Sequence, residues 1–156
     1  MRVVSYLIEA HIFRFVNNEL EFLLLKRSSQ EKYPNIWQMV TGSVDSNEKG
    51  FETALREIKE ETGLTPVKFW VAPQVNSFYS AENDEICMVP VFAAMVQTDS
   101  EVKISSEHSE FKWLAKDEAK KLLAWKGQRM AVDTIHEYFT NEKSFLKFVE
   151  IDLQSI

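Results

Sequence analysis

Hydrophobic and polar residues alternate along the N-terminal part of this chain, and that pattern predicts strands. Residues 3–13 place an apolar side chain at every second position, which favours a strand with one apolar face. Residues 21–27, EFLLLKR, predict a second strand, and the turn-forming stretch VNNE joins the two. Further strands are expected at four places: 37–40, 67–79, 85–97 and 111–114. Pro73 and Pro90 interrupt the two long segments, so bulges or edge positions are expected there.

A repeat of three and four residues replaces the alternation between positions 48 and 62 and predicts a helix. Its apolar stripe consists of Phe51, Ala54, Leu55, Ile58 and Thr62. We expect Asp45 and Glu48 to form a capping box at its start and Gly63 to end it. Two more helices are expected at 116–124 and 128–139, the second with an apolar face of Met130, Ala131, Thr134, Ile135 and Tyr138.

Strands interleaved with helices at this length predict an α/β or α+β sandwich, in which helices cover a mixed sheet. The 156 residues contain no repeat, low-complexity tract or linker rich in Pro, Gly or Ser, so we expect a single domain. The tail from residue 141 is apolar enough to pack, but its period does not distinguish a helix from a strand.

Charge and composition exclude some classes of partner. The net charge is −6, with 24 acidic against 18 basic residues, which argues against a polynucleotide but not against a small phosphorylated substrate. No apolar run approaches the roughly 20 residues that span a bilayer, so no membrane association is expected. The single cysteine, Cys87, cannot form an intrachain disulfide, and the expected compartment is the cytoplasm.

Three glutamates crowd the end of the first predicted helix. Glu57 and Glu61 lie about 40° apart around the axis, and Glu60 lies about 60° to the other side of Glu57. Mutual repulsion and the helix dipole together cost on the order of 1 kcal/mol. Such a cluster is ordinarily a solvated acidic surface. A divalent cation would reverse both effects, because hard cations favour carboxylate oxygens.

The spacing of residues around these glutamates decides between a solvated acidic surface and a cation site. Gly42 is followed after five residues by Glu48, and after seven more by REIKEETGL at 56–64. This pattern resembles the signature of the Nudix hydrolases. Every specified position is met: Gly42, Glu48, Arg56, Glu57, Ile58, Glu60, Glu61, Gly63 and Leu64.

The resemblance implies a fold, a cofactor and a set of roles. It implies a Nudix-type α/β/α sandwich over residues 1–156, with the Nudix box at 42–64 and a C-terminal extension at about 141–156. It also implies Mg²⁺ as cofactor, with Mn²⁺ as an accepted substitute. Arg56 would orient the acidic cluster, and the general base stays open between a box glutamate such as Glu57 and an acid from another loop. The implied metal ligands are Gly42 through its carbonyl, Glu57, Glu60, Glu61 and Glu107.

A closer resemblance covers roughly residues 3–140. The segments NIWQMVTGSVDSNE, ISSEHSEFKWLAKDEAKKLL and WKGQRMAVDTIHEYF are similar to bacterial dihydroneopterin triphosphate pyrophosphatases, also described as dATP pyrophosphohydrolases. In these enzymes a glutamate just before the strand serves as a further metal ligand or base, and here that position is Glu107. His108 beside it is expected to be a polar loop residue rather than a catalytic one.

Each candidate substrate-binding residue has two interpretations, one functional and one structural. Lys26 and Arg27 end a strand and could bind terminal phosphates, or be ordinary surface residues. Trp37 could stack on a base or pterin, or fill the core. Tyr79 sits at a strand end with the same alternatives, and Arg129 lies at a junction between helices that could line the pocket.

The resemblance leads to one principal hypothesis and two alternatives. The principal one is a pyrophosphohydrolase that converts a nucleoside or pterin triphosphate to the monophosphate and pyrophosphate. The first alternative is a dinucleoside polyphosphate hydrolase of the Ap4A type, for which Tyr79 falls in the expected region. The second is a catalytically silent Nudix binding module. The expected partner is a small-molecule substrate only, and the expected state is a monomer or homodimer.

Overall fold

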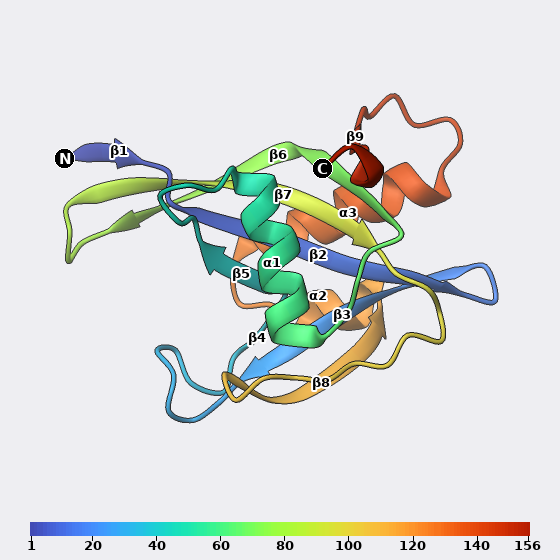
Figure 1. Cartoon of the computed structure of the whole chain (residues 1–156), viewed down its shortest axis with the longest axis horizontal. Coiled ribbons are helices and arrows are strands. Elements are labelled where there is room, and N and C mark those ends of the chain that lie inside the picture. The colour runs from blue at the N-terminus through green and yellow to red at the C-terminus, as the bar shows by residue number, and fades with distance from the viewer.

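A single mixed sheet organises the computed structural model, which describes all residues 1–156 (Figure 1). The strands are β1 (Arg2–Val4), β2 (Leu7–Val16), β3 (Glu19–Arg27), β4 (Trp37–Gln38), β5 (Val40–Ser43), β6 (Lys68–Ser80), β7 (Glu85–Met95), β8 (His108–Ala115) and β9 (Val149–Ile151). The main path of the sheet runs β4-β3-β2-β7-β6-β9, while β1 pairs with β7, β5 with β2 and β8 with β3. The helices are α1 (Gly50–Thr62), α2 (Lys116–Leu122), α3 (Lys126–Thr140) and a 3-10 turn, η1 (Leu153–Ser155).

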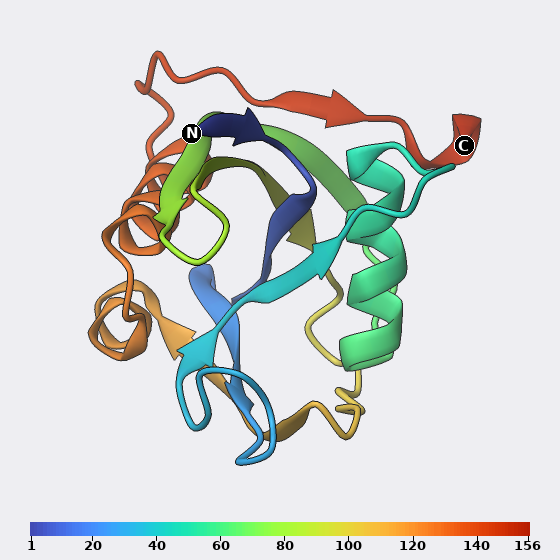
Figure 2. The ribbon, with the colours of Figure 1, turned by 90° about the vertical axis from the view of Figure 1, so that its left-hand side faces the viewer.

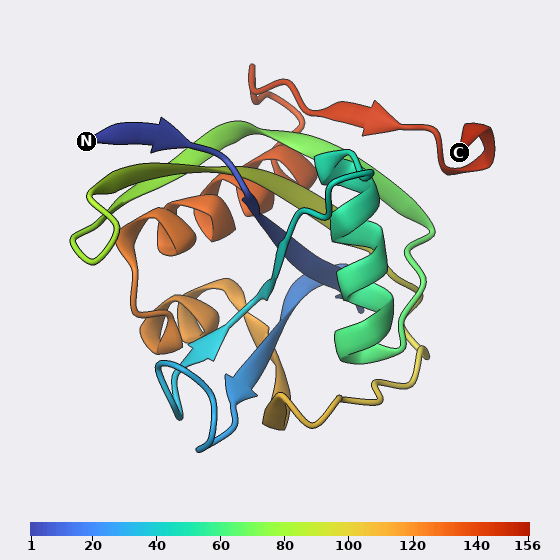
Figure 3. The ribbon, with the colours of Figure 1, turned by 60° about the vertical axis from the view of Figure 1, so that its left-hand side comes forward.

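Helices cover both faces of this sheet, which confirms the predicted fold class. Figures 2 and 3 show α1 (green) on one side of the strands and α2 and α3 (orange) on the other. Each side has its own core. The α1-side core comprises Ile8, Ala10, Ile12, Leu23, Leu25, Val40, Ala54, Ile58, Leu64, Phe69, Phe92, Ala94 and Val96. The α3-side core comprises Phe13, Leu20, Phe22, Leu24, Met39, Trp70, Ala72, Val91, Ala93, Ala119, Leu123, Ala131, Val132, Ile135 and Phe148.

The predicted strand at 3–13 is in fact two strands, β1 and β2, both parallel to β7. The chain leaves the sheet around Ser5 and Tyr6, and β2 then continues to Val16. Both faces of β2 are buried, whereas the alternation predicted only one. Glu9 and His11 therefore lie inside the protein, where His11 Nε2 and Glu9 Oε2 are 2.6 Å apart.

A register shift lies at both prolines, as predicted. The pairing of β6 with β7 shifts between Val71 and Val75, on either side of Pro73. Pro90 pairs opposite Val75 and borders the same shift on β7. Within this shift β6 meets the start of α3, where Gln74 Nε2 donates to the Gly127 carbonyl at 2.8 Å.

Two local predictions for the helices are wrong. The capping residue of α1 is Lys49, whose N–H donates to the Glu52 carboxylate at 2.8 Å, so Asp45 and Glu48 do not form the box. In α3, Met130 is exposed and Val132 is buried in its place, because the helix packs on the sheet through a face turned away from Met130. Gly63 ends α1 as predicted, with φ of 73°.

The tail after α3 wraps around the edge of the sheet. Phe148 packs on the α3-side core beside Tyr138, and Ile151 and Leu153 pack on the α1-side core. Between them β9 pairs antiparallel with β6, matching Phe69 with Ile151. None of the helices combines the length and the apolar character needed to cross a membrane.

Candidate metal centre and active site

The carboxylates of α1 differ in their surroundings. Glu60 is exposed, Glu57 is half-buried and Glu61 is only 3% exposed. Glu61 is buried because the last turn of α1 lies under the segment at 103–105. There the Lys103 N–H donates to Thr62 O, and the Ser105 N–H donates to Glu61 O.

One arginine holds the exposed part of the acidic cluster together. Arg56 donates from Nε to Glu48 Oε1 at 2.6 Å and from Nη1 to Glu57 Oε1 at 2.9 Å and Glu60 Oε2 at 3.2 Å. Nη2 reaches the Ser43 carbonyl at 3.3 Å, which ties the helix to the end of β5. The Arg56 guanidinium, helped by the Thr53 hydroxyl, lowers the pKa of Glu48 to about 2. Glu48 is thus the permanent partner of Arg56, while Glu57 and Glu60 each keep an oxygen free of it.

Gly42 lets the backbone of β5 approach Glu57 closely. A Cβ atom at position 42 would lie 2.3 Å from Glu57 Cγ and 2.5 Å from its Cδ, closer than real Cβ contacts come. Only glycine fits this approach, so the requirement at this position is steric.

A second group of candidate metal-ligand atoms lies around the buried carboxylate of Glu61. Glu61, Glu107 and His108 each offer one such atom, and these three atoms lie within 4.8 Å of one another. His108 Nε2 is 3.8 Å from Glu61 Oε1, and both ring nitrogens of His108 and Glu61 Oε2 are buried without a hydrogen-bond partner. Buried polar atoms without hydrogen-bond partners are rare in proteins, so these atoms are candidates for ligands of a bound ion.

Burial and neighbouring charges shift the pKa values of this group in the absence of a cation. Burial, reinforced by the charges of Glu57 and Glu107, raises the pKa of Glu61 to about 9. Burial also raises the pKa of Glu57, against the opposing effect of Arg56. Burial and the nearby Arg27 charge lower the pKa of His108 to about 4, so its imidazole is neutral at pH 7. Carboxylates that resist being ionised together are stabilised by a nearby positive charge, and a neutral imidazole can coordinate a metal ion. Together these side chains suit a divalent cation.

The structure brings only some of the predicted substrate residues near this centre. Arg27 pairs with His108 across β3 and β8 and donates from Nε to the Lys32 carbonyl at 2.6 Å. Lys26 points to the α3 side of the sheet and forms an ion pair with Glu110 at 3.2 Å.

The other three lie away from the carboxylates. Trp37 packs on the α3-side core, with Lys112 Nζ 5.0 Å from its ring centre. Tyr79 is exposed on the β6–β7 hairpin and donates to Asp84 Oδ1 at 3.0 Å. Arg129, in α3, donates from Nε to the Leu123 carbonyl at 2.7 Å, and α3 lies on the opposite side of the sheet from α1.

Sequence reasoning gave too little weight to His108 and did not identify the polar network on β2. Asn76 Nδ2 donates to both carboxylate oxygens of Glu9 at 3.1 Å, so that Glu9 links β2 with β6. The available signal was the placement of Glu9 and His11 within an apolar strand. For His108, the signal was its position directly after Glu107.

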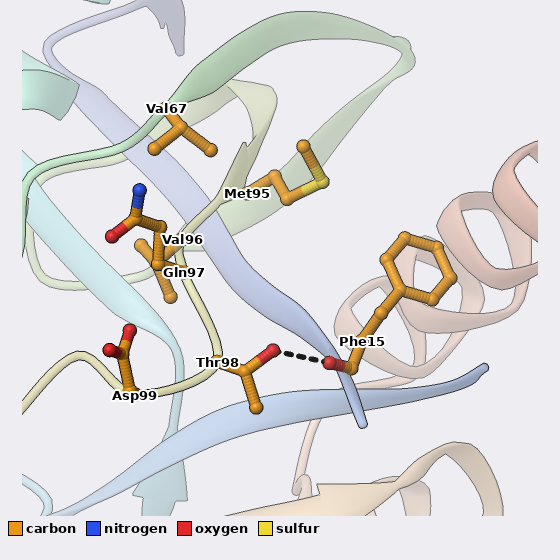
Figure 4. Close-up of a pocket in the computed structure, with 7 residues that line it drawn as sticks. All are labelled: Phe15, Val67, Met95, Val96, Gln97, Thr98 and Asp99. Carbon is orange, nitrogen blue, oxygen red and sulfur yellow. Dashed lines mark hydrogen bonds between the residues drawn. The ribbon is translucent and has the colours of Figure 1, made fainter. Parts of the chain in front are cut away.

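The chemistry does not coincide with the cavity drawn in Figure 4. That cavity, of about 550 Å³, lies where β2 and β7 end. Its polar lining consists of Gln97, Thr98 and Asp99, with no basic side chain, and Thr98 donates to the Phe15 carbonyl. It therefore offers no positive charge to a phosphate, and the acidic end of α1 remains the better candidate for the active site.

Comparison with known proteins identifies the family. The family model described as the NUDIX domain matches residues 6–134. The chain belongs to the Nudix family. This Nudix protein is a hydrolase of phosphoric anhydride bonds, and Nudix hydrolases generally use a divalent metal.

Its relatives include proteins of two named activities. It is 31% identical over 126 residues to the bis(5'-nucleosyl)-tetraphosphatase (asymmetrical) of Rattus norvegicus, covering 78% of this chain and 82% of that protein. It is 28% identical over 107 residues to the nucleoside triphosphatase NudI of Escherichia coli, covering 64% of this chain and 76% of that protein.

Solved structures show the same Nudix fold. A C. elegans Ap4A hydrolase binary complex matches with a TM-score of 0.74 at 23% identity, covering 86% of this chain and 96% of that one. The E. coli dihydroneopterin triphosphate pyrophosphohydrolase matches with a TM-score of 0.65, also at 23% identity, covering 82% of this chain and 94% of that one.

Proposed function

We propose that this protein is a Mg²⁺-dependent pyrophosphohydrolase that cleaves a nucleoside or pterin triphosphate to the monophosphate and pyrophosphate. The observation that carries the proposal is the arrangement at the end of α1. There one arginine orients Glu57 and Glu60, and buried ligand atoms without partners lie beside them.

In this proposal Glu57, Glu60, Glu61 and Glu107 would hold the cation together with the Gly42 carbonyl. When bound, the cation neutralises charge on the diphosphate and lowers the pKa of an attacking water. Arg56 keeps Glu57 and Glu60 in place by donating one hydrogen bond to each, and it stays charged because Glu48 pairs with it.

Either Glu57 or Glu107 would accept the proton of the attacking water. Glu57 is half-buried, and Arg56 holds one of its oxygens at 2.9 Å while the other stays free to take that proton. Glu107 is exposed and adjoins His108, so it can approach the centre from the loop side.

For the substrate, Arg27 is the best-placed phosphate ligand, because it lies beside His108 at the centre. Lys26, Trp37 and Arg129 lie on the other side of the sheet from the carboxylates, and Tyr79 is exposed on the β6–β7 hairpin, so we leave these four out of the proposed site.

The triphosphate is supported by the motifs that flank the metal centre. The segment WQMVTGSV contains Gly42, and SEHSEFKWL contains Glu107 and His108. Both resemble the dihydroneopterin triphosphate pyrophosphatases. We further propose one domain over residues 1–156 and, from the buried free thiol of Cys87, a cytoplasmic location.

A second candidate is asymmetrical hydrolysis of a dinucleoside tetraphosphate. The similarity to the Rattus norvegicus enzyme favours it, because that relative carries this activity in its name. Both reactions break a phosphoanhydride bond and would use the same carboxylates.

The test is turnover with Mg²⁺ across a panel of dATP, the other nucleoside triphosphates, dihydroneopterin triphosphate and diadenosine tetraphosphate. Release of pyrophosphate and a monophosphate from dATP or the pterin supports the principal proposal. Turnover of diadenosine tetraphosphate alone would replace it with the second candidate.

Two variants then identify the base. Glu57→Gln and Glu107→Gln are compared with Glu142→Gln, which changes an exposed carboxylate in the tail. Removing the base should lower kcat by about 10²–10⁴-fold and abolish the acid limb of the pH–rate profile. The exposed control should keep the parent rate.

A further inference from the structure

His108 occupies a position that packing alone does not explain. Its side chain is 1% exposed, yet neither ring nitrogen has a hydrogen-bond partner. A buried imidazole normally satisfies at least one nitrogen, because an unpaired buried polar group costs about 1–3 kcal/mol. The fold tolerates this cost at the first residue of β8, directly after the exposed Glu107.

The ring nitrogens of His108 do not simply bond to the neighbouring acid. The Nε2–Glu61 Oε1 separation of 3.8 Å is too long for a hydrogen bond. Glu61 Oε2 is also buried and without a partner. Buried atoms without partners thus come from α1 and from β8, two elements separated in the chain by more than forty residues, and they converge on one spot.

The spacing of these atoms suits an ion. A metal bound at about 2.0–2.3 Å from two ligands keeps those ligands no more than about 4.6 Å apart. The ligand atoms of Glu61, Glu107 and His108 lie within 4.8 Å of one another, so a shift of a few tenths of an ångström would close the site.

A nitrogen ligand changes which cation this position selects. Mg²⁺ takes oxygen ligands and keeps several waters, whereas imidazole nitrogen favours first-row transition ions. The α1 carboxylates held by Arg56 offer oxygen only. The position bounded by His108 is the one place in the centre with a nitrogen donor.

We propose that His108 is a direct ligand of the cation held by Glu61 and Glu107, and that this position prefers a first-row transition ion over Mg²⁺. The inference rests on the proposed metal dependence and deepens it, by assigning a ligand and an order of metal preference. It gives the centre two chemically different positions, one with oxygen ligands only and one with mixed nitrogen and oxygen ligands.

The experiment uses Mn²⁺ as the probe, on the intact protein without substrate. Pulsed electron paramagnetic resonance of bound Mn²⁺ reports a coordinated imidazole directly, through modulation from its ¹⁴N nucleus. We expect this modulation in the parent protein, its loss in His108→Gln, and its persistence in the matched control His136→Gln. His136 lies on α3, on the other side of the sheet.

Binding constants provide the second readout. Loss of hydrogen-bonding groups around metal ligands already costs about 10–100-fold in metal affinity, so His108→Gln should weaken Mn²⁺ by at least about tenfold. Mg²⁺ should be affected less, so that the ratio of the two affinities falls.

Three results would count against these ideas, and they are separable. Bound Mn²⁺ without ¹⁴N modulation in the parent protein overturns the assignment of His108, and this measurement does not depend on any variant folding. An unchanged Mn²⁺-to-Mg²⁺ affinity ratio in a folded His108→Gln protein overturns the preference. Failure of the parent protein to bind either ion would instead contradict the proposed function.

Discussion

Replacing Gly42 by alanine tests whether the backbone of β5 sets the position of Glu57. The added methyl group would lie 2.3 Å from Glu57 Cγ, 2.5 Å from Cδ and 2.7 Å from Oε1. The conflict involves the Glu57 side chain alone, which can turn away. The fold should therefore survive while Glu57 leaves its place.

The size of the effect follows from these distances. Ordinary Cβ contacts begin at 3.4 Å, so the Glu57 side chain must retreat by about 1 Å. That movement breaks its 2.9 Å ion pair with Arg56, which is partly exposed and stabilises the fold by no more than about 1 kcal/mol. A 1 Å displacement of a catalytic group, by contrast, costs about 10²-fold in rate.

The assay measures kcat/KM on the best substrate of the panel and the free energy of unfolding in urea, both for Gly42→Ala and for a matched glycine. Gly50→Ala is that control, because its methyl group would meet only Ile8 and Phe92 at 3.6 and 4.0 Å, which are ordinary contacts. We expect about 10²-fold lower kcat/KM for Gly42→Ala with about 1 kcal/mol lower stability, and parent-like activity for Gly50→Ala.

Two results would refute this reasoning. Parent-like activity of Gly42→Ala would show that Glu57 is not needed where the structure places it. A loss of several kcal/mol in stability, with activity falling only in proportion to the unfolded fraction, would show that the backbone yields and not the side chain.

Three further predictions concern the same helix. Arg56→Lys keeps the charge but loses the planar fork that reaches several carboxylates, so kcat/KM should fall tenfold or more while the melting temperature changes little, as turnover assays and thermal melts can check. Gly63→Ala forces a side chain into a left-handed backbone with φ of 73°, and should lower the free energy of unfolding in urea by about 1 kcal/mol. Glu61 has a folded-state pKa of about 9 against an ordinary 4.5, so folding takes up a proton between these values. The melting temperature of the protein in EDTA should therefore fall as pH rises from 5 to 9, and added Mg²⁺, which needs the ionised carboxylate, should restore it most at the alkaline end. A flat profile in EDTA would contradict that assignment.

The sequence predicted the features that arise from periodic apolar patterns and from the spacing of the Nudix motif. The apolar stripe of α1, its stop at Gly63 and the sheet flanked by helices followed from periodicity, because local packing and burial act on every turn and every strand residue. The three α1 carboxylates of the proposed metal centre followed from the Nudix spacing, and Glu107 followed from the closer resemblance.

What the sequence could not predict depends on partners far away in the chain. Glu48 does not cap α1, because Arg56, two turns into the helix, recruits its carboxylate instead. Glu61 is buried by a loop more than forty residues later, so no helical projection could place it. Arg129 and Tyr79 make hydrogen bonds within the protein that only the folded structure reveals.

The parallel pairing of β2 with β7 at the middle of the sheet has a consequence for how the molecule forms. β2 pairs with β7 through Glu9 and Val91, residues separated by more than eighty positions. Closing so long a loop is slow, and the centre of the sheet cannot form until β7 has been synthesised. His108 and Glu107 emerge later still. A growing chain that carries only the Nudix box therefore presents its glutamates without these two partners, and the ability to select a cation arrives with the last third of the chain.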